Sequence, residues 1–166
     1  MSKKNILLKN NAAKLVELFI KKDFRLATIE SCTGGLLSSA ITQVSGSSAV
    51  IDRGFITYSN KSKIEMVGVK PDLIKKFGAV SAEVAAAMAK GGLYSSNADI
   101  TIAVTGIAGP SGGTNEKPVG LVHIATASNI IEEEIIKKSF MFSGDREEVR
   151  MQSALESFNL LRSTYC

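Results

Sequence analysis

The stretch from residue 28 to residue 35 constrains the fold of this chain more than any other. It reads Thr-Ile-Glu-Ser-Cys-Thr-Gly-Gly and overlaps an apolar run over residues 24–29 that is typical of a buried strand. Apolar residues then recur at helical spacing from Leu36 to Val44. The polar residues 30–33 therefore occupy a strand-to-helix turn, which is where open α/β sheets place their ligands.

The chemistry of this turn suits a reactive site. Gly34 and Gly35 let a ligand approach the backbone closely, and the N–H groups at the start of the helix point at whatever is bound. The turn also offers two candidate nucleophiles, Ser31 and Cys32. The alternative interpretation is that Thr33 only caps the helix and the glycines only form a tight turn.

Composition narrows the class of protein. The 166 residues fit one domain spanning residues 1–166, and 45% of them are hydrophobic. We expect no membrane association and a cytoplasmic location, because we find neither a bilayer-length apolar run nor a signal peptide. The net charge of +4 comes without a Lys/Arg block, so nucleic acid is not a favoured partner, and an anionic small molecule fits as well.

The histidine and cysteine content argues against a metal site. One histidine, His123, and two separated cysteines, Cys32 and Cys166, give no cluster of zinc ligands, and two cysteines are too few for a disulfide framework. His123 lies in an apolar, strand-like run over residues 119–126, where a satisfied sheet histidine is the favoured interpretation. Without a catalytic histidine, a nucleophile has to be activated by lysine, tyrosine or a carboxylate.

Strand-like and helix-like segments alternate along the chain. Strands are predicted over residues 24–29, 50–58, 99–104, 119–126 and 130–142. Helices are predicted from Asn10 or Asn11 to Lys22, from residue 36 to about 44, over residues 61–67 with Ser59 or Asn60 as cap, from Pro71 to Gly78, over residues 82–94 after Ser81, and after residues 143–146. The alternation with a late strand pair predicts a three-layer α/β/α sandwich with a mixed sheet.

Further candidate residues lie at other strand ends. Tyr58 ends the second strand, and Lys63 follows on the first or second turn of the next helix. The glycine-dense loop over residues 105–114 can wrap an anion, although it is neither a Walker A loop nor a dinucleotide-binding turn. Arg146 and Arg150 share one face of the last helix and can reach a phosphate.

Taken together, the motifs resemble the CinA C-terminal domain family. The blocks that carry the resemblance occur in order: Glu30-Ser31-Cys32-Thr33-Gly34-Gly35, Gly46-Ser47-Ser48-Ala49, Thr57-Tyr58-Ser59-Asn60 with Lys63, Gly78-Ala79-Val80-Ser81, Thr105-Gly106-Ile107-Ala108-Gly109-Pro110, Glu116-Lys117-Pro118-Val119-Gly120, and Gly144-Asp145-Arg146 with Arg150. They span nearly the whole chain.

The resemblance implies an amidohydrolase that converts nicotinamide mononucleotide to nicotinic acid mononucleotide and ammonia in pyridine-nucleotide salvage. It also implies a three-layer α/β/α fold, usually dimeric, with no cofactor. Many relatives carry this domain behind a larger N-terminal one, which we do not expect here. The "competence/damage-inducible" name of the family suggests a DNA-related role, which this sequence does little to support.

The residues allow an assignment of roles on this substrate. Ser31 is the expected nucleophile, Lys63 the base that takes its proton, and Tyr58 a relay or an orienting group, with Thr105 completing the hydrogen-bond network. Lys63 is preferred over Lys61 from the resemblance alone. The expected substrate-binding residues are Thr33, Gly34, Gly35, Ser48, Asn60, Gly106, Gly109, Gly112, Gly113 and Arg146.

Several alternatives stay open at this point. Ser48 and Cys32 are rival nucleophiles, ranked after Ser31 in that order. A non-catalytic module that senses a nucleotide or docks on a DNA-uptake or repair protein is the second function class. An amidase for another carboxamide is the third.

Overall fold

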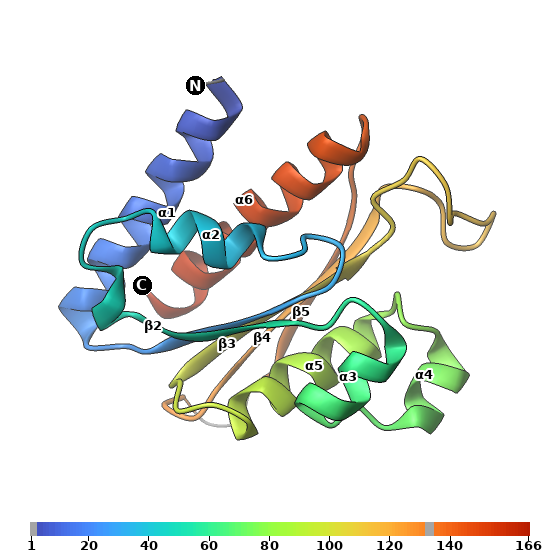
Figure 1. Ribbon diagram of the computed structural model, residues 1–166, viewed down its shortest axis with the longest axis horizontal. Helices are drawn as coiled ribbons and strands as arrows, with labels where there is room; N and C mark the ends of the chain where they lie inside the picture. The colour runs from blue at the N-terminus through green and yellow to red at the C-terminus, as the bar shows by residue number, and fades with distance from the viewer. Residues whose placement is uncertain (1–2, 132–134) are drawn as a thin grey trace.

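A five-stranded mixed sheet forms the centre of the computed structural model, which describes residues 3–131 and 135–166 (Figure 1). The strands run in the order β2-β1-β3-β4-β5. Their bounds are β1 (Leu26–Glu30), β2 (Ile51–Ile56), β3 (Ile100–Gly106), β4 (Leu121–Ser128) and β5 (Ile136–Met141). β1 pairs in parallel with both β2 and β3, whereas β4 is antiparallel to β3 and to β5. The predicted mixed sheet is thus confirmed.

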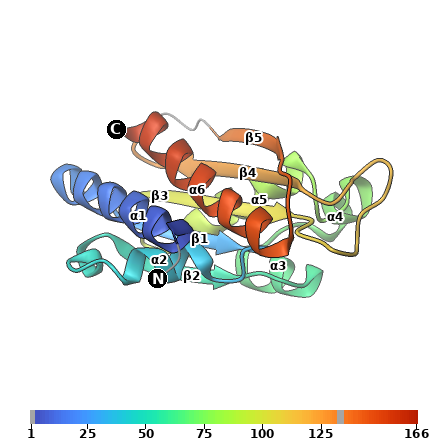
Figure 2. The same ribbon diagram turned by 90° about the horizontal axis from the view of Figure 1, so that it is seen from above.

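Helices cover both faces of this sheet. The bounds are α1 (Lys3–Lys22), α2 (Leu36–Thr42), α3 (Asn60–Val67), α4 (Pro71–Phe77), α5 (Ala82–Tyr94) and α6 (Arg146–Tyr165). In Figure 1, α1, α2 and α6 lie on one face and α3, α4 and α5 on the other. Figure 2 looks onto the first of these layers, where α1 and α6 pack together. The α/β/α sandwich is therefore confirmed as well.

Alternating strand residues supply the two halves of the core. Ile100, Ile102 and Val104 of β3 pack under α1, α2 and α6, whereas Ala103 packs toward α5. The α5 face is built from small residues, which lets this helix lie close to the sheet. At Gly92 a Cβ atom would lie 2.4 Å from Ile29 Cδ1, so the helix and the sheet meet where only glycine fits. The predicted helix over residues 82–94 is thus confirmed.

The element boundaries differ from the prediction in a few places. α1 begins at Lys3 rather than at Asn10 or Asn11, and Asn11 instead accepts a hydrogen bond from Arg162 inside the folded protein. Ser59 and Ser62 form a capping box at the start of α3, and Gly68 ends that helix, as predicted. β5 begins at Ile136, and residues 132–134 of the predicted strand lie outside the described residues.

The connectivity decides which loops can share a site. β1, β2 and β3 are parallel, so residues that follow their carboxyl ends meet at one edge of the sheet. That edge receives Ser31 after β1, the segment from Thr57 to Lys63 after β2, and the glycine-rich loop after β3. The opposite edge receives the short 3₁₀ helix η1 (Ser47–Ala49), which precedes β2.

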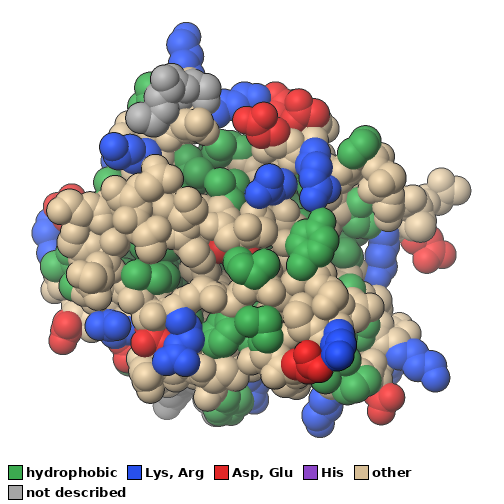
Figure 3. All heavy atoms as spheres, in the orientation of Figure 1, with side chains coloured by type: hydrophobic (Ala, Val, Ile, Leu, Met, Phe, Trp, Pro, Cys, Tyr) green, Lys and Arg blue, Asp and Glu red, His purple; other side chains and the backbone are tan. Residues whose placement is uncertain are grey.

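Two surface features bear on the class of partner. No helix in the described ranges is both long and apolar enough to cross a bilayer. On the face drawn in Figure 3, the coloured Lys and Arg side chains are scattered among acidic and apolar ones. On this face they do not form the continuous basic patch that is typical of nucleic-acid binding.

Candidate active site

Ser31 and Lys63 meet at the carboxyl edge of the sheet. The Ser31 amide continues the β1–β3 ladder by donating to Val104 O at 3.0 Å, which fixes the residue directly after the strand. Lys63 lies on α3, which begins right after β2. Its Nζ atom is 3.1 Å from Ser31 Oγ. The structure therefore brings together the two residues that the sequence analysis placed first, and it selects Lys63 over the exposed Lys61.

The Lys63 amine is almost completely removed from water. Its side chain is 1% exposed, and Nζ donates to Thr57 O at 2.7 Å and Tyr58 O at 3.3 Å. Burial lowers the pKa of Lys63, because desolvation penalises the charged ammonium. Among the described residues, no carboxylate forms an ion pair with it. A neutral amine has two N–H donors for the two carbonyls and one lone pair for the Ser31 hydroxyl, so this environment matches a base.

The two rival nucleophiles are less well placed. The Cys32 side chain is buried, and desolvation raises the pKa of its thiol to about 11, which keeps it protonated and unreactive at neutral pH. Ser48 is exposed in η1, at the opposite end of β1 and β2 from Ser31. The expectation that Ser48 shares a site with Ser31 is therefore wrong within one chain, because η1 precedes β2, whereas the site lies beyond its carboxyl end.

A buried carboxylate organises the turn that carries Ser31. Glu30 is fully buried and accepts hydrogen bonds from the amides of Gly35, Leu37 and Ser38, at 2.9–3.1 Å, and from the Ser38 hydroxyl at 2.8 Å. The first helical turn of α2 is thus capped by a side chain five residues upstream of Gly35. Thr33 does not cap it, because the N-cap residue is Gly35 with φ 95°. These amides are already occupied, so the expectation that the N–H groups at the start of this helix bind a ligand does not extend to them.

Glu30→Gln is expected to destabilise the fold by about 3 kcal/mol, because a buried charged acceptor with several donors is lost. Oε2 accepts from Gly35 and Leu37, and Oε1 accepts from Ser38, so the glutamine NH2 group faces backbone N–H donors in either orientation. Urea unfolding measures the change. Asp99→Asn is the matched control, since this carboxylate accepts one amide at the other sheet edge and should cost less. Equal stabilities for Glu30→Gln and the wild type would contradict the capping role.

The Tyr58 side chain contacts Arg146 rather than the Lys63 amine. Its hydroxyl accepts a hydrogen bond from Arg146 Nη2 at 3.0 Å, and only its backbone carbonyl contacts Lys63. Arg146 Nη1 also donates to Gly109 O at 2.9 Å, which ties α6 to the glycine-rich loop. The structure thus brings Tyr58, Arg146 and Gly109 together, and the Tyr58 phenol binds Arg146 rather than the Lys63 amine for which it was expected to act as a relay.

The other expected residues of β3 and the glycine-rich loop have partners within the fold. Thr105 Oγ1 donates to Ala79 O at 2.9 Å, so it fastens the α4–α5 connection rather than contacting Ser31 or Lys63. A Cβ atom at Gly109 would lie 2.5 Å from Val119 Cγ1, and one at Gly113 would lie 2.8 Å from Val119 N. A Cβ atom at Gly106 would clash with the side chain of Val122, 2.6 Å away. The close packing of the chain on itself therefore requires glycine at these three positions, whatever else the loop binds.

A cavity of about 710 Å³ lies beside this constellation. It is lined by Asn5, Leu36, Ala108, Pro110, Val119, Gly144, Asp145, Arg146, Glu147, Arg150 and Met151. Ser31 and Lys63 are not in its lining. Arg150 Nη2 donates to Thr33 O at 2.8 Å, and Arg146 holds Tyr58, so the walls of the cavity are connected to the reactive turn. Its charged lining residues are two arginines, Arg146 and Arg150, and two acidic residues, Asp145 and Glu147.

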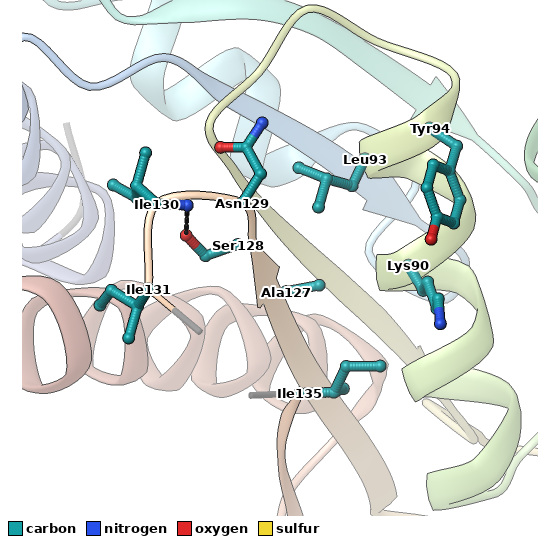
Figure 4. Close-up of a pocket in the computed structure, with 9 residues that line it drawn as sticks. All are labelled: Lys90, Leu93, Tyr94, Ala127, Ser128, Asn129, Ile130, Ile131 and Ile135. Atoms are coloured by element: carbon teal, nitrogen blue, oxygen red, sulfur yellow. Dashed lines mark hydrogen bonds between the residues drawn. The ribbon is translucent and has the colours of Figure 1, made fainter. Parts of the chain in front are cut away.

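A second cavity lies at the other end of the sheet. It encloses about 450 Å³ between α5 and the segment that follows β4, where Tyr94, Leu93 and Ile130 contribute to its walls (Figure 4). Figure 4 also shows Ser128 accepting a hydrogen bond from the Ile130 amide within its rim. The start of β3 and the end of β4 form this edge of the sheet. The cavity is therefore remote from Ser31 and Lys63.

His123 has a structural partner on the neighbouring strand. Its Nδ1 atom lies 2.8 Å from Ser139 Oγ, so it is the satisfied sheet histidine that was predicted. Desolvation is the largest cause that lowers the pKa of His123, followed by the positive charge of Lys117. Within residues 3–131 and 135–166, no three His, Cys, Asp or Glu side chains gather in a group that could hold a metal ion.

Four further residues near the site have positions or roles that were not predicted from the sequence. Asn60 is the exposed first residue of α3, and Thr33 is fully buried in the reactive turn. Glu30 was named only as part of the polar turn and Thr57 only as part of a motif, yet both lie beside the reactive pair. A glutamate that ends a buried strand without a nearby basic residue was the signal for Glu30, because such a carboxylate needs backbone donors.

Comparison with known proteins gives consistent matches. The CinA C-terminal domain family matches residues 8–165. A CinA-like protein of Geotalea daltonii is 50% identical over 145 residues, which cover 87% of this chain and 34% of that protein. A protein of Enterobacter agglomerans named nicotinamide-nucleotide amidohydrolase PncC is 47% identical over 136 residues, which are 82% of each protein. Several other curated relatives, the Geotalea daltonii protein among them, are matched over about a third of their own length.

Solved structures match over nearly the full length. The competence/damage inducible protein CihA from Agrobacterium tumefaciens superimposes with a TM-score of 0.91 at 41% identity, covering 95% of this chain and 94% of that one. The competence damage-inducible protein A from Klebsiella pneumoniae gives a TM-score of 0.89 at 31% identity, with coverage of 95% and 96%. The fold described above is therefore the fold of these proteins.

Proposed function

The chain belongs to the CinA C-terminal domain family, and from this premise we propose that it hydrolyses the carboxamide of nicotinamide mononucleotide. The products are nicotinic acid mononucleotide and ammonia, as in pyridine-nucleotide salvage. The name of the Enterobacter agglomerans relative, which this chain covers to 82%, supports the reaction class. The observation that carries the proposal is the 3.1 Å contact between Ser31 Oγ and the buried Lys63 amine.

In the first half-reaction, Ser31 Oγ attacks the amide carbon while Lys63 takes its hydroxyl proton. The C–N bond then breaks, and the proton on Lys63 passes to the departing nitrogen, which leaves as ammonia. In the second half-reaction a water oxygen attacks the resulting ester and gives a proton to Lys63. That proton goes to Ser31 Oγ as the ester bond breaks, which restores the starting state.

The developing negative charge on the amide oxygen needs backbone donors. Glu30 occupies three amides of the α2 start, and Gly34 N donates to Ser31 O at 3.1 Å. In the described part of the chain, the amides of Cys32 and Thr33 donate no hydrogen bond to another main-chain group. We therefore assign the oxyanion to these two amides, directly after the nucleophile.

The nucleotide part of the substrate fits the neighbouring cavity. Arg146 and Arg150 lie one turn apart at the start of the 20-residue helix α6, whose N-terminal dipole favours a phosphate. Arg146 is positioned by Tyr58 and Gly109, which makes it a preorganised ligand. The remaining proposed substrate contacts lie in the reactive turn, at the start of α3 and in the glycine-rich loop. They are Thr33, Gly34, Gly35, Asn60, Gly106, Gly112 and Gly113.

Ammonia release from three carboxamides tests this function. We expect the mononucleotide to be hydrolysed with a kcat/KM roughly a hundredfold or more above that of nicotinamide riboside, because the phosphate contacts are lost, and free nicotinamide to be slower still. Equal rates on all three would favour an amidase for another carboxamide. A wild-type protein that binds the mononucleotide without ever releasing ammonia would favour a non-catalytic nucleotide-binding or competence and DNA-damage accessory module.

The remaining expectations belong to the same proposal. We propose that residues 1–166 act as one catalytic domain, as a cytoplasmic homodimer, with no cofactor beyond the substrate. The 82% coverage of the Enterobacter agglomerans relative by this chain supports a catalytic unit of this size. Sedimentation of the purified protein measures the assembly state.

A further inference from the structure

Two buried threonine hydroxyls stand out from the others. Six threonines in the described part of the chain are buried to 1% exposure or less, namely Thr28, Thr33, Thr57, Thr101, Thr105 and Thr126. Four of them use their hydroxyls in hydrogen bonds. The hydroxyls of Thr33 and Thr57 have no partner. Both of these residues lie at the edge of the sheet that carries Ser31 and Lys63.

An unpartnered buried hydroxyl is unfavourable for folding, because it gives up its hydrogen bonds to water and gains none in return. Such a group in a folded protein calls for an explanation in the chemistry of the site. Thr57 is 0% exposed, so its hydroxyl is shielded from solvent in this state. The partner of this hydroxyl therefore has to come from the groups already packed around it.

The backbone fixes Thr57 against the Lys63 amine. The Thr57 amide donates to Glu30 O at 2.8 Å, and the Thr57 carbonyl accepts from Lys63 Nζ at 2.7 Å. The hydroxyl oxygen is only a few covalent bonds from that carbonyl oxygen, and rotation about χ1 moves it. Side chains alternate along β2, and Phe55 packs toward α5 and α3, so Thr57, two residues later, faces the side from which Lys63 arrives.

The number of hydrogens on the amine changes during the proposed reaction. A neutral Lys63 amine has two N–H donors, which the carbonyls of Thr57 and Tyr58 accept, and a lone pair that faces Ser31 Oγ. After it takes the serine proton it has three donors. When Ser31 Oγ is bonded to the substrate it is only a weak hydrogen-bond acceptor. The third N–H of the ammonium then needs a different acceptor.

We propose that the Thr57 hydroxyl is that acceptor, a positioning residue which binds Lys63 in its transient ammonium form. The inference rests on the proposed amidohydrolase function. In each half-reaction, Lys63 holds one extra proton between its uptake from Ser31 or water and its delivery to ammonia or Ser31. During that interval Thr57 Oγ1 accepts the additional N–H, and it is released when the proton leaves.

The acidic side chains near Lys63 have other partners, so the acceptor for its ammonium form is a neutral group. A Cys32 thiolate would raise the pKa of Lys63, but burial keeps that thiol protonated and uncharged. On α3 itself, Lys61 and Glu65 are exposed and lie 3.6 Å from each other. The Glu30 carboxylate binds the start of α2, and Arg150 binds Thr33 O. The Tyr58 phenol, on the segment after β2, binds Arg146. A hydroxyl stabilises the ammonium without holding it permanently charged.

Thr57→Val tests the inference, because valine has the same shape and lacks the hydroxyl. We expect kcat on nicotinamide mononucleotide to fall about ten- to a hundredfold, the loss of one hydrogen bond to a charged group. The alkaline rise of kcat, which reports the substrate-bound enzyme, should move to lower pH by about one unit, because the ammonium form is no longer stabilised there. Thr57→Ser keeps the hydroxyl and should stay within a few-fold of the wild type.

Thr101→Val is the matched control at a distance from the site. Its hydroxyl donates to Ala89 O at 2.8 Å, so the substitution should lower the melting temperature and leave the pH profile unchanged. Thr57→Val should retain or raise the melting temperature, since it removes an unpartnered hydroxyl. An active wild type with a Thr57→Val variant of unchanged kcat and pH profile overturns the inference alone. A wild type that releases no ammonia overturns the proposed function and the inference together.

Discussion

Replacing Lys63 with methionine is expected to abolish ammonia release while the protein stays folded. Methionine matches the length of the lysine stem and fills the same buried space, but it cannot take a proton from Ser31 Oγ, 3.1 Å away in the native protein. We expect kcat/KM to fall by roughly three to four orders of magnitude, the range for loss of a general base coupled to a nucleophile.

The folded state should tolerate this change because two effects oppose each other. The substitution removes a buried amine, whose desolvation is unfavourable, but it leaves the carbonyls of Thr57 and Tyr58 without their donor. We expect the melting temperature to change by only a few degrees, equivalent to about 1 kcal/mol. Circular dichroism on heating measures it, and an unfolded Lys63→Met protein would contradict this balance.

The pH dependence of the wild type follows from the same amine. Burial lowers the pKa of Lys63, and the neutral form is the active base. kcat/KM should therefore rise with pH and reach its plateau below the ordinary lysine value of 10.5. A rate that falls with rising pH across this range would contradict a lysine base.

Replacing Ser31 with alanine is the second large expected effect. The variant should lose ammonia release by roughly four orders of magnitude, because no other side-chain hydroxyl of the described residues is bonded to Lys63. It should still bind nicotinamide mononucleotide with near wild-type affinity, since the proposed phosphate contacts of Arg146 and Arg150 are untouched. Isothermal titration measures the binding.

Two control variants separate Ser31 from its rivals. Cys32→Ser should stay close to wild-type activity, because the pKa of the native thiol is raised to about 11 and it is not the nucleophile. Ser48→Ala should also stay active, because Ser48 lies at the other end of β1 and β2. Activity that survives in Ser31→Ala and disappears in Cys32→Ser would move the nucleophile to the neighbouring residue.

The reactive edge could be predicted because Ser31 and the segment that carries Tyr58 and Lys63 each follow a predicted strand closely, and two parallel neighbours bring such positions to one edge. The choice of Lys63 over Lys61 came from the family resemblance. The same reasoning excludes Ser48 once η1 is recognised as preceding a strand rather than following one. Ser48 was grouped with the site because of its motif, and motif order along a chain carries no information about which end of the sheet a loop occupies.

Side-chain direction and long-range capping could not be predicted in the same way. The Glu30 interactions depend on the turn at Gly34 and Gly35, with φ values of 58° and 95°, which folds the chain back on its own strand. The Tyr58 phenol was expected near Lys63, yet it reaches Arg146, 88 residues away. The start of α1 was missed because Asn11 looks like a cap in sequence but bonds with Arg162 in the folded protein.

A double-mutant cycle on ammonia release tests the central claim most directly. It compares kcat/KM on nicotinamide mononucleotide for the wild type, Ser31→Ala, Lys63→Met and the double variant, all with chelator present. If Lys63 acts through Ser31, both single variants and the double variant should fall to the same residual rate. Losses that multiply in the double variant, or a Ser31→Ala variant as active as the wild type, would contradict the dyad.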